Sequence, residues 1–135
     1  FSPLFIVFVL PLSLHALAFL ISVQIPDVEA DRRAGKRTFV AIFGIRAGFI
    51  LAVALLACMS AFYLAAALIF INFPIDFRLI ALLSLLPLGV SMLGMIKGNK
   101  SPEINEKLVK YQVICYVLFT IALDAYLLLA LFHPV

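Results

Sequence analysis

Three acidic residues lie between residues 27 and 31, and four basic residues follow by residue 37. Asp27 and Asp31 are four residues apart, so a helical backbone would place both carboxylates on one face, one turn apart, with Glu29 pointing away. Like charges at this spacing destabilise a helix unless a cation lies between them. Mg²⁺ suits such a pair, because it accepts one or two carboxylates and takes further ligands from phosphate oxygens. The spacing therefore favours a Mg²⁺ site formed by Asp27 and Asp31.

The basic residues that follow this pair suggest a phosphate ligand. Lys36 supplies a compact ammonium, and Arg37 supplies a guanidinium that can bind phosphate through two hydrogen bonds. Gly35 comes directly before them and permits a sharp backbone turn. The same spacing also arises by accident in a charged loop beside a membrane, so both interpretations stand at this point.

The composition of the whole chain limits where such a loop can lie. The chain has 135 residues, of which 66% are hydrophobic and 13% charged, and its mean hydropathy is +1.23. Soluble domains carry about 25% charged residues, and disordered segments combine low hydrophobicity with high net charge. Both classes are therefore excluded. We expect an all-helical membrane protein, because lipid offers no partner to exposed backbone groups.

Charged residues are confined to short segments between long apolar stretches. Residues 1–26, 47–75 and 79–96 contain none, and Asp124 is alone in residues 111–135. A helix needs about 20 apolar residues to cross the bilayer core. The pattern therefore predicts a bundle of four transmembrane helices, near residues 3–24, 47–71, 79–96 and 111–132.

The basic residues predict how these helices are oriented. Nine of the ten lie in two loops, 27–46 and 97–110, and only Arg78 lies near the turn at residues 72–76. Because Lys and Arg in short loops mark the cytoplasmic side, we expect both loops in the cytoplasm and the turn on the opposite side. The net charge of +3 thus reflects topology, and no nucleic-acid partner is expected.

The segment DVEADRRAGKRT, residues 27–38, resembles the second aspartate-rich motif of the UbiA superfamily of intramembrane prenyltransferases. That motif has the form D-x-x-x-D-x-x-x-G-K-x-T and is followed by a glycine a few residues on. The matching residues in this chain are Asp27, Asp31, Gly35, Lys36, Thr38 and Gly44. Members have nine transmembrane helices around a central cavity. The resemblance implies that residues 1–135 are the C-terminal part of a membrane prenyltransferase domain and correspond to its last four helices.

The resemblance also implies a reaction. Such enzymes transfer a polyprenyl group from a prenyl diphosphate to a lipophilic or aromatic acceptor, such as a quinone precursor, within the membrane and with Mg²⁺ as cofactor. Asp27 and Asp31 match the catalytic, metal-binding carboxylates, and Lys36 and Arg37 fall where cations would contact the diphosphate. The first aspartate-rich motif, N-D-x-x-D, does not occur in the sequence. These residues alone are therefore expected to be inactive and to belong to a longer enzyme.

A non-catalytic membrane module, such as a transporter half or a subunit of a complex, is the alternative. In such a module the acidic residues of the loop would only form ion pairs with Arg32, Arg33 and Lys36.

Polar residues also occur inside the predicted spans. Gln112, Tyr116, Thr120 and Asp124 recur every four residues along the last span, and His15 lies within the first. A carboxylate inside a span is a candidate functional group, so one interpretation is that the stripe lines a substrate cavity and that His15 is an acid–base group. We favour the other interpretation, in which both features pack against neighbouring helices, where polar groups find partners. Ser101 and Pro102 have the residue types of a helix start, before the last span.

Overall fold

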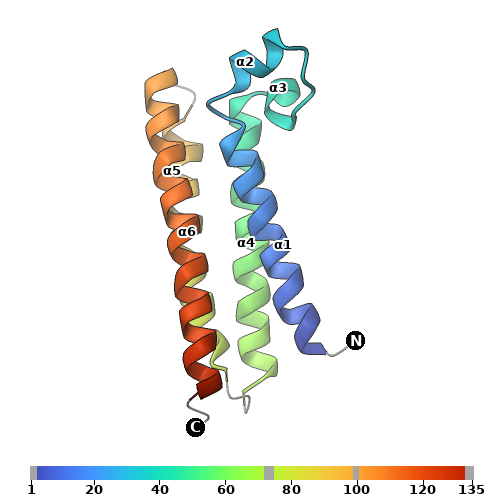
Figure 1. Ribbon diagram of the computed structural model, residues 1–135, viewed down its shortest axis with the longest axis vertical. Coiled ribbons are helices and arrows are strands. Elements are labelled where there is room, and N and C mark those ends of the chain that lie inside the picture. Colours follow the sequence, from blue (N-terminus) through green and yellow to red (C-terminus); the bar gives the residue numbers. More distant parts are fainter. Residues whose placement is uncertain (1–2, 72–74, 99–100, 133–135) are drawn as a thin grey trace.

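The computed structural model describes residues 3–71, 75–98 and 101–132, and within these ranges it describes the side chains of residues 5–130. The regular elements of this part of the chain are all helices (Figure 1). The predicted turn begins at Asn72, and its residues 72–74 lie outside the described residues.

Four long helices form the body of the molecule. Each is long and apolar enough to cross a membrane, which confirms the predicted all-helical architecture with four apolar spans. They are α1 (Pro3–Val23), α4 (Ile45–Ile69), α5 (Phe77–Lys97) and α6 (Pro102–Phe132).

The last helix is longer than the apolar stretch that predicted it. α6 begins at Pro102, so residues 102–110 extend the span as one continuous helix. The hydroxyl oxygen of Ser101 accepts a hydrogen bond from the backbone N–H of Ile104 at 3.3 Å. This bond satisfies one of the free donors at the helix start, so Ser101 caps the helix as its residue type predicted.

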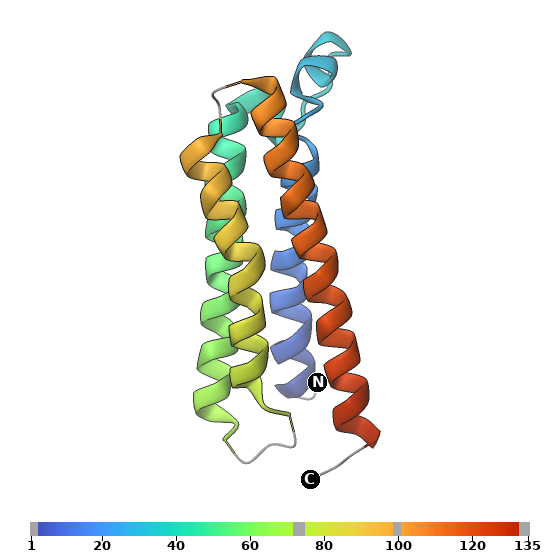
Figure 2. The same cartoon turned by 90° about the vertical axis from the view of Figure 1, so that its left-hand side faces the viewer.

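The long helices pack as a four-helix bundle. α1 packs on α4, α4 on α5 and α5 on α6, and a sparser set of contacts joins α6 to α1. Figures 1 and 2 show the bundle from two directions, with α1 starting and α6 ending at the same end. Two short helices, α2 (Val28–Arg33) and α3 (Phe39–Phe43), lie at the other end.

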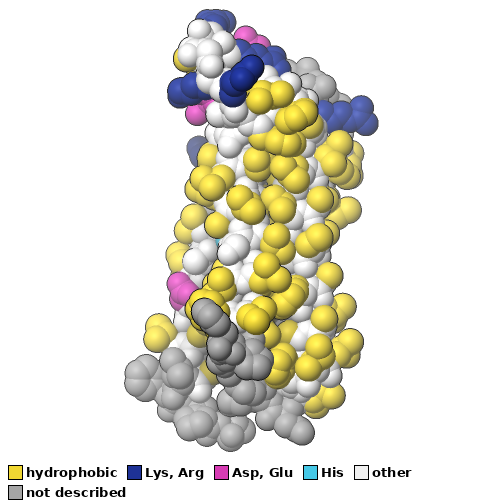
Figure 3. Space-filling model, turned by 90° about the vertical axis from the view of Figure 1, so that its right-hand side faces the viewer, with side chains coloured by type: hydrophobic (Ala, Val, Ile, Leu, Met, Phe, Trp, Pro, Cys, Tyr) yellow, Lys and Arg dark blue, Asp and Glu magenta, His cyan; other side chains and the backbone are white. Residues whose placement is uncertain are grey.

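The outer surface of the bundle is apolar. Large hydrophobic side chains such as Leu68 and Leu82 are 69% and 65% exposed. Figure 3 shows apolar side chains along the length of one face, with Lys and Arg gathered at the end that carries α2 and α3. Exposed apolar surface of this extent suits a lipid environment. With its four candidate spans, the chain is an integral membrane protein.

A close contact at Gly48 places the loop between α1 and α4 on the bundle. A Cβ atom at Gly48 would lie only 2.9 Å from Cγ2 of Val40 and 3.5 Å from Cγ1 of Ile25. Glycine therefore lets the chain on both sides of the charged loop approach the start of α4. Val40 and Ile25 are buried there with Phe49, in a small apolar cluster of their own.

Candidate functional site

The charged loop consists of two short helices joined by a tight turn. The chain leaves α1 at Val23, forms α2, turns at Gly35, and forms α3 before α4 begins. Val28 of α2 and Val40 of α3 are buried in the same apolar cluster beneath the loop. Isolated helices of five or six residues are not stable in water, so this anchoring holds the loop in place.

Asp27 and Asp31 lie one helical turn apart at the start of α2. Asp27 occupies the N-cap position, and its carbonyl oxygen accepts a hydrogen bond from the backbone N–H of Asp31 at 2.8 Å. Their surroundings differ, because Asp27 is exposed whereas Asp31 is buried. The loop thus offers one carboxylate in solvent and another in a protected position beside it.

The Asp31 carboxylate contacts two side chains from beyond the turn. Its Oδ1 lies 3.1 Å from the Lys36 ammonium nitrogen, and the Asp31 side chain is 9% exposed against 66% for Lys36. Its Oδ2 accepts a hydrogen bond from the Thr38 hydroxyl at 3.2 Å. Gly35 has a φ of +69°, a conformation that glycine adopts without steric cost. The turn at Gly35 therefore folds Lys36 and Thr38 back onto Asp31.

Thr38 links this carboxylate to the next helix. Its hydroxyl oxygen also accepts a hydrogen bond from the backbone N–H of Ala41 at 3.3 Å, which caps the start of α3. A threonine just before an apolar run is an ordinary N-cap signal, so the capping role was readable from the sequence. The bond to Asp31 was not, because it depends on the turn at Gly35.

The remaining polar side chains mostly secure the loop itself. The Nε of Arg32 donates to the carbonyl oxygen of Ala41 at 2.9 Å, and the backbone N–H of Val40 donates to Oε1 of Gln24 at 3.4 Å. Sequence reasoning missed both roles, since each joins residues that are far apart on the unfolded chain. Arg37 is exposed, so its guanidinium faces solvent.

Two of the contacts fit the non-catalytic alternative as well. Lys36 pairs with Asp31, and Arg33 pairs with Glu29 at 3.8 Å, both as that alternative predicts. The third expected partner, Arg32, instead bonds to a backbone carbonyl. Ion pairing alone therefore does not separate the two interpretations.

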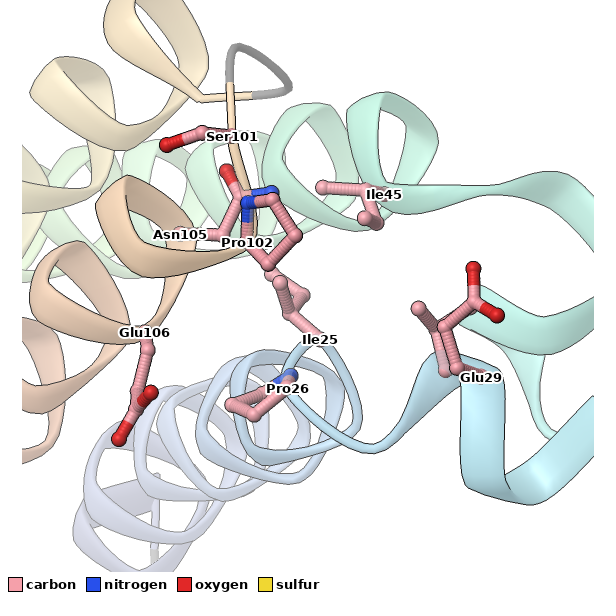
Figure 4. A pocket seen from close by; sticks show the side chains of 9 residues that line it. Ile25, Pro26, Glu29, Ile45, Ser101, Pro102, Asn105 and Glu106 are labelled. Atoms are coloured by element: carbon pink, nitrogen blue, oxygen red, sulfur yellow. The ribbon is translucent and has the colours of Figure 1, made fainter.

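A cavity of about 270 Å³ opens beside the loop, between the end of α1, the start of α4 and the start of α6. Figure 4 shows Ile25 and Pro26 between two acidic side chains, Glu29 of α2 and Glu106 of α6. Asp27 and Asp31 are not among its lining residues. The cavity is therefore a neighbour of the aspartate pair and is separate from it.

The described residues contain no group of three or more His, Cys, Asp or Glu side chains that could hold a metal ion. Mg²⁺ needs only one or two carboxylates when phosphate oxygens supply further ligands. That requirement is met by Asp27 and Asp31, whose carboxylates are one helical turn apart. The exposed Lys36 and Arg37 follow them in the same loop. The donor set thus suits a metal ion that arrives with a phosphate-bearing substrate.

The packing interpretation of the polar residues in the spans is confirmed for Tyr116 and His15. The Tyr116 hydroxyl lies 3.1 Å from the hydroxyls of both Ser22 and Ser91, in the buried interior. The His15 ring packs edge-on against the Tyr116 ring at 5.2 Å between centroids, and its Nε2 lies 3.4 Å from the Thr120 hydroxyl.

The same interpretation is wrong for Asp124. Gln112 and Tyr116 are buried, but Thr120 and Asp124 are exposed. A four-residue spacing advances the side chain by about 40° per step beyond a full turn, so later members of the stripe rotate out of the core. Phe119 and Leu123 occupy the core positions instead.

A bundle of apolar helices defines an integral membrane protein, and one end of this bundle carries two carboxylates one turn apart and several exposed basic residues. Residues 1–117 match the model of the UbiA prenyltransferase family. The match covers most of the chain, so the chain belongs to this family, as the aspartate-rich segment predicted. No curated protein and no solved structure matches the chain. Family membership implies prenyltransferase activity with a prenyl diphosphate substrate, and the family is generally Mg²⁺-dependent.

Proposed function

We propose that residues 1–135 form the C-terminal part of an intramembrane prenyltransferase domain. The enzyme transfers a polyprenyl group from a prenyl diphosphate to an aromatic acceptor of the quinone-precursor kind. Loops 27–46 and 97–110 face the cytoplasm in this proposal, because they hold nine of the ten basic residues.

One observation carries the proposal. Asp27 and Asp31 lie one turn apart in a family member, at the charged end of an apolar bundle, and the turn at Gly35 places Lys36 beside Asp31. Asp27 and Asp31 would hold Mg²⁺, and Lys36 and Arg37 would bind the diphosphate. When bound, Mg²⁺ supplies positive charge that stabilises the leaving diphosphate.

The protein's own residues have definite tasks in this reaction. Asp27 is exposed and can reach an incoming metal–diphosphate complex, while Thr38 orients Asp31 through its hydrogen bond. Lys36 and Arg37 are exposed and can turn to the phosphate oxygens. The carbon–oxygen bond of the prenyl diphosphate breaks, the acceptor ring forms a new bond to the allylic carbon, and the ring loses a proton. Apolar surroundings protect the allylic cation from water.

The test uses the full-length enzyme in membranes, with a radiolabelled prenyl diphosphate and several aromatic acceptors. Asp27→Ala and Asp31→Ala should each abolish Mg²⁺-dependent transfer, because each removes a metal ligand. Glu29→Ala is the matched control, since Glu29 lies in the same helix but pairs with Arg33 on the exposed surface. Transfer that persists in both aspartate variants would show that the metal is held elsewhere.

A further inference from the structure

Arg78 is a single basic residue at the end of the bundle opposite α2 and α3. The other nine basic residues lie in loops 27–46 and 97–110, whereas Arg78 is the second residue of α5 (Figure 1). Its side chain is exposed. Among the described residues it forms no ion pair, either with Asp76 beside it or with Asp124 of α6. An arginine at the end of a span extends its guanidinium to the lipid–water interface, so Arg78 is placed to bind an anion there.

An apolar groove runs from Arg78 along the face where α4 packs on α5. Its volume is about 300 Å³, and on α5 it covers residues 78–85, a length of about 10 Å. Besides Arg78, small side chains and leucines line it: Ser60, Ala61 and Leu64 of α4, and Ala81, Leu82 and Leu85 of α5. The Ser60 hydroxyl already has a partner, since the Ser84 hydroxyl lies 2.8 Å from it. The groove therefore suits an apolar chain.

A second hollow, of about 240 Å³, joins Arg78 to a carboxylate. Asp76 and Arg78 are its two charged lining residues. Oδ1 of Asp76 accepts a hydrogen bond from the backbone N–H of Arg78 at 2.9 Å, which caps α5 and leaves Oδ2 as a further acceptor. The backbone N–H of Asp76 donates to the Tyr126 hydroxyl at 2.7 Å, which ties the start of α5 to α6. The hollow thus presents one cation and one carboxylate on an anchored segment.

We propose that the groove and the hollow together bind one phospholipid with an ethanolamine headgroup. The Arg78 guanidinium binds its phosphate through two hydrogen bonds, the Asp76 carboxylate accepts a hydrogen bond from its ammonium, and one acyl chain lies in the groove between α4 and α5. The inference is independent of the proposed catalytic function.

Charge complementarity selects this occupant over other amphiphiles. A fatty acid would satisfy Arg78 but offers no cation to Asp76. A glycerol headgroup is equally without a cation, and a choline headgroup carries a quaternary ammonium that has no N–H group to donate. Only the ethanolamine headgroup supplies both an anion for Arg78 and a hydrogen-bonding cation for Asp76.

The test is lipid retention by the full-length protein. The protein is extracted with detergent from membranes that hold ethanolamine, choline and glycerol phospholipids in equal amounts, and native mass spectrometry identifies the lipids that remain bound. We expect one retained phospholipid per chain, with the ethanolamine form favoured roughly tenfold over the choline form, because one hydrogen bond to a charged group is worth about that factor.

Variants of the two charged residues test the headgroup contacts. Arg78→Met should lower retention roughly tenfold, whereas Lys107→Met, which removes an exposed basic residue at the other end of the bundle, should not. Asp76→Asn keeps a side chain that can cap the helix and should abolish the preference for ethanolamine over choline while a phospholipid is still retained.

A second pair of variants tests the groove and does not depend on the charges. Ala61→Leu fills the groove and should lower retention, whereas Ala65→Leu adds the same volume at an exposed position of α4 outside the groove and should not. A benzophenone amino acid at Leu82 should crosslink to phospholipid in the native membrane. These measurements decide the proposal even where Arg78→Met fails to fold.

Four outcomes would overturn the proposal. One is equal retention of the three headgroups by the wild type, and another is unchanged retention in Arg78→Met or in Ala61→Leu. A crosslink from Leu82 to a polypeptide would show that protein covers the groove. Displacement of the bound lipid by inorganic phosphate alone would show a phosphate site to which the groove contributes nothing.

Discussion

The ammonium nitrogen of Lys36 lies 3.1 Å from Oδ1 of Asp31, and this carboxylate is one of the two that we propose as Mg²⁺ ligands. A lysine ammonium and a divalent ion beside the same carboxylate oxygen repel each other and compete for it. The proposed roles of the two residues are therefore linked: when Lys36 turns to the diphosphate, it frees Asp31 for the metal.

This link makes Lys36→Met an informative variant. Without the competing ammonium, the full-length protein should bind Mn²⁺, used as a probe for Mg²⁺, roughly two- to fivefold more tightly, which corresponds to a partly exposed ion pair of up to about 1 kcal/mol. The KM for prenyl diphosphate should rise at the same time, because a phosphate contact is lost. Electron paramagnetic resonance measures the first effect and steady-state kinetics the second.

Lys36→Arg is the control for this prediction. It keeps the positive charge and the capacity to pair with Asp31, so Mn²⁺ affinity should stay within about twofold of the wild type. Weaker Mn²⁺ binding in Lys36→Met would contradict the competition, since it would mean that the ammonium supports the metal site.

A second prediction concerns the turn that brings Lys36 to Asp31. Gly35 has a φ of +69°, and a Cβ atom added there would meet nothing within 4 Å. Gly35→Ala should therefore cost about 1–2 kcal/mol of loop stability through backbone conformation alone. Gly35→Asn should cost less, because asparagine tolerates the left-handed region. Hydrogen exchange of residues 28–43 in detergent would measure the local opening.

Gly89→Ala provides the comparison for Gly35→Ala. Gly89 lies inside α5, and a Cβ atom there would likewise meet open space, but its helical conformation suits alanine. This change should be neutral or stabilise the protein by about 0.5–1 kcal/mol. Equal effects of the two alanine substitutions would show that the conformation at Gly35 is not specific to glycine.

The positions of the long helices could be predicted from the sequence because the signals are local. Runs without charge fix where a chain can cross a membrane, and Ser101 and Pro102 mark a helix start by their types. The short helices α2 and α3 were not predicted as separate elements. They are held in place because Val28 and Val40 are buried with Phe49 in one apolar cluster, which joins residues that are distant on the chain.

The candidate site likewise combines features that the sequence predicts with features that only the structure shows. The one-turn relation of Asp27 and Asp31 follows from their spacing, which is a property of a single helix. The ion pair of Lys36 with Asp31 depends on the backbone conformation at Gly35, and the exposure of Asp124 depends on how α6 is rotated in the bundle. Neither rotation nor loop conformation is encoded by spacing alone, so only the structure reveals them.

A third prediction concerns the hydroxyl groups that join three helices inside the bundle. Ser22 donates its proton to the carbonyl oxygen of Ala18 at 2.9 Å, so Tyr116 must donate to Ser22. Ser91 is then the donor to Tyr116. Tyr116→Phe removes both bonds and should lower the free energy of unfolding by about 1–2 kcal/mol.

Thermal denaturation in detergent would measure this change. The double variant Tyr116→Phe with Ser91→Ala should recover part of the loss, because it also removes the serine hydroxyl that Tyr116→Phe leaves without this partner. Strictly additive losses in the double variant would argue against the Ser91–Tyr116 bond.

A fourth prediction concerns Gln112, whose side chain is fully buried in α6. Within the described part of the chain, neither its amide nitrogen nor its amide oxygen has a hydrogen-bond partner. A buried amide without partners costs about 1–3 kcal/mol, so Gln112→Met, which keeps the volume, should raise the melting temperature of the bundle. Gln112→Ala should lower it by leaving a cavity. If Gln112→Met proves as harmful as Gln112→Ala, the amide bonds to a group beyond the described residues, and its polarity then serves the assembled enzyme.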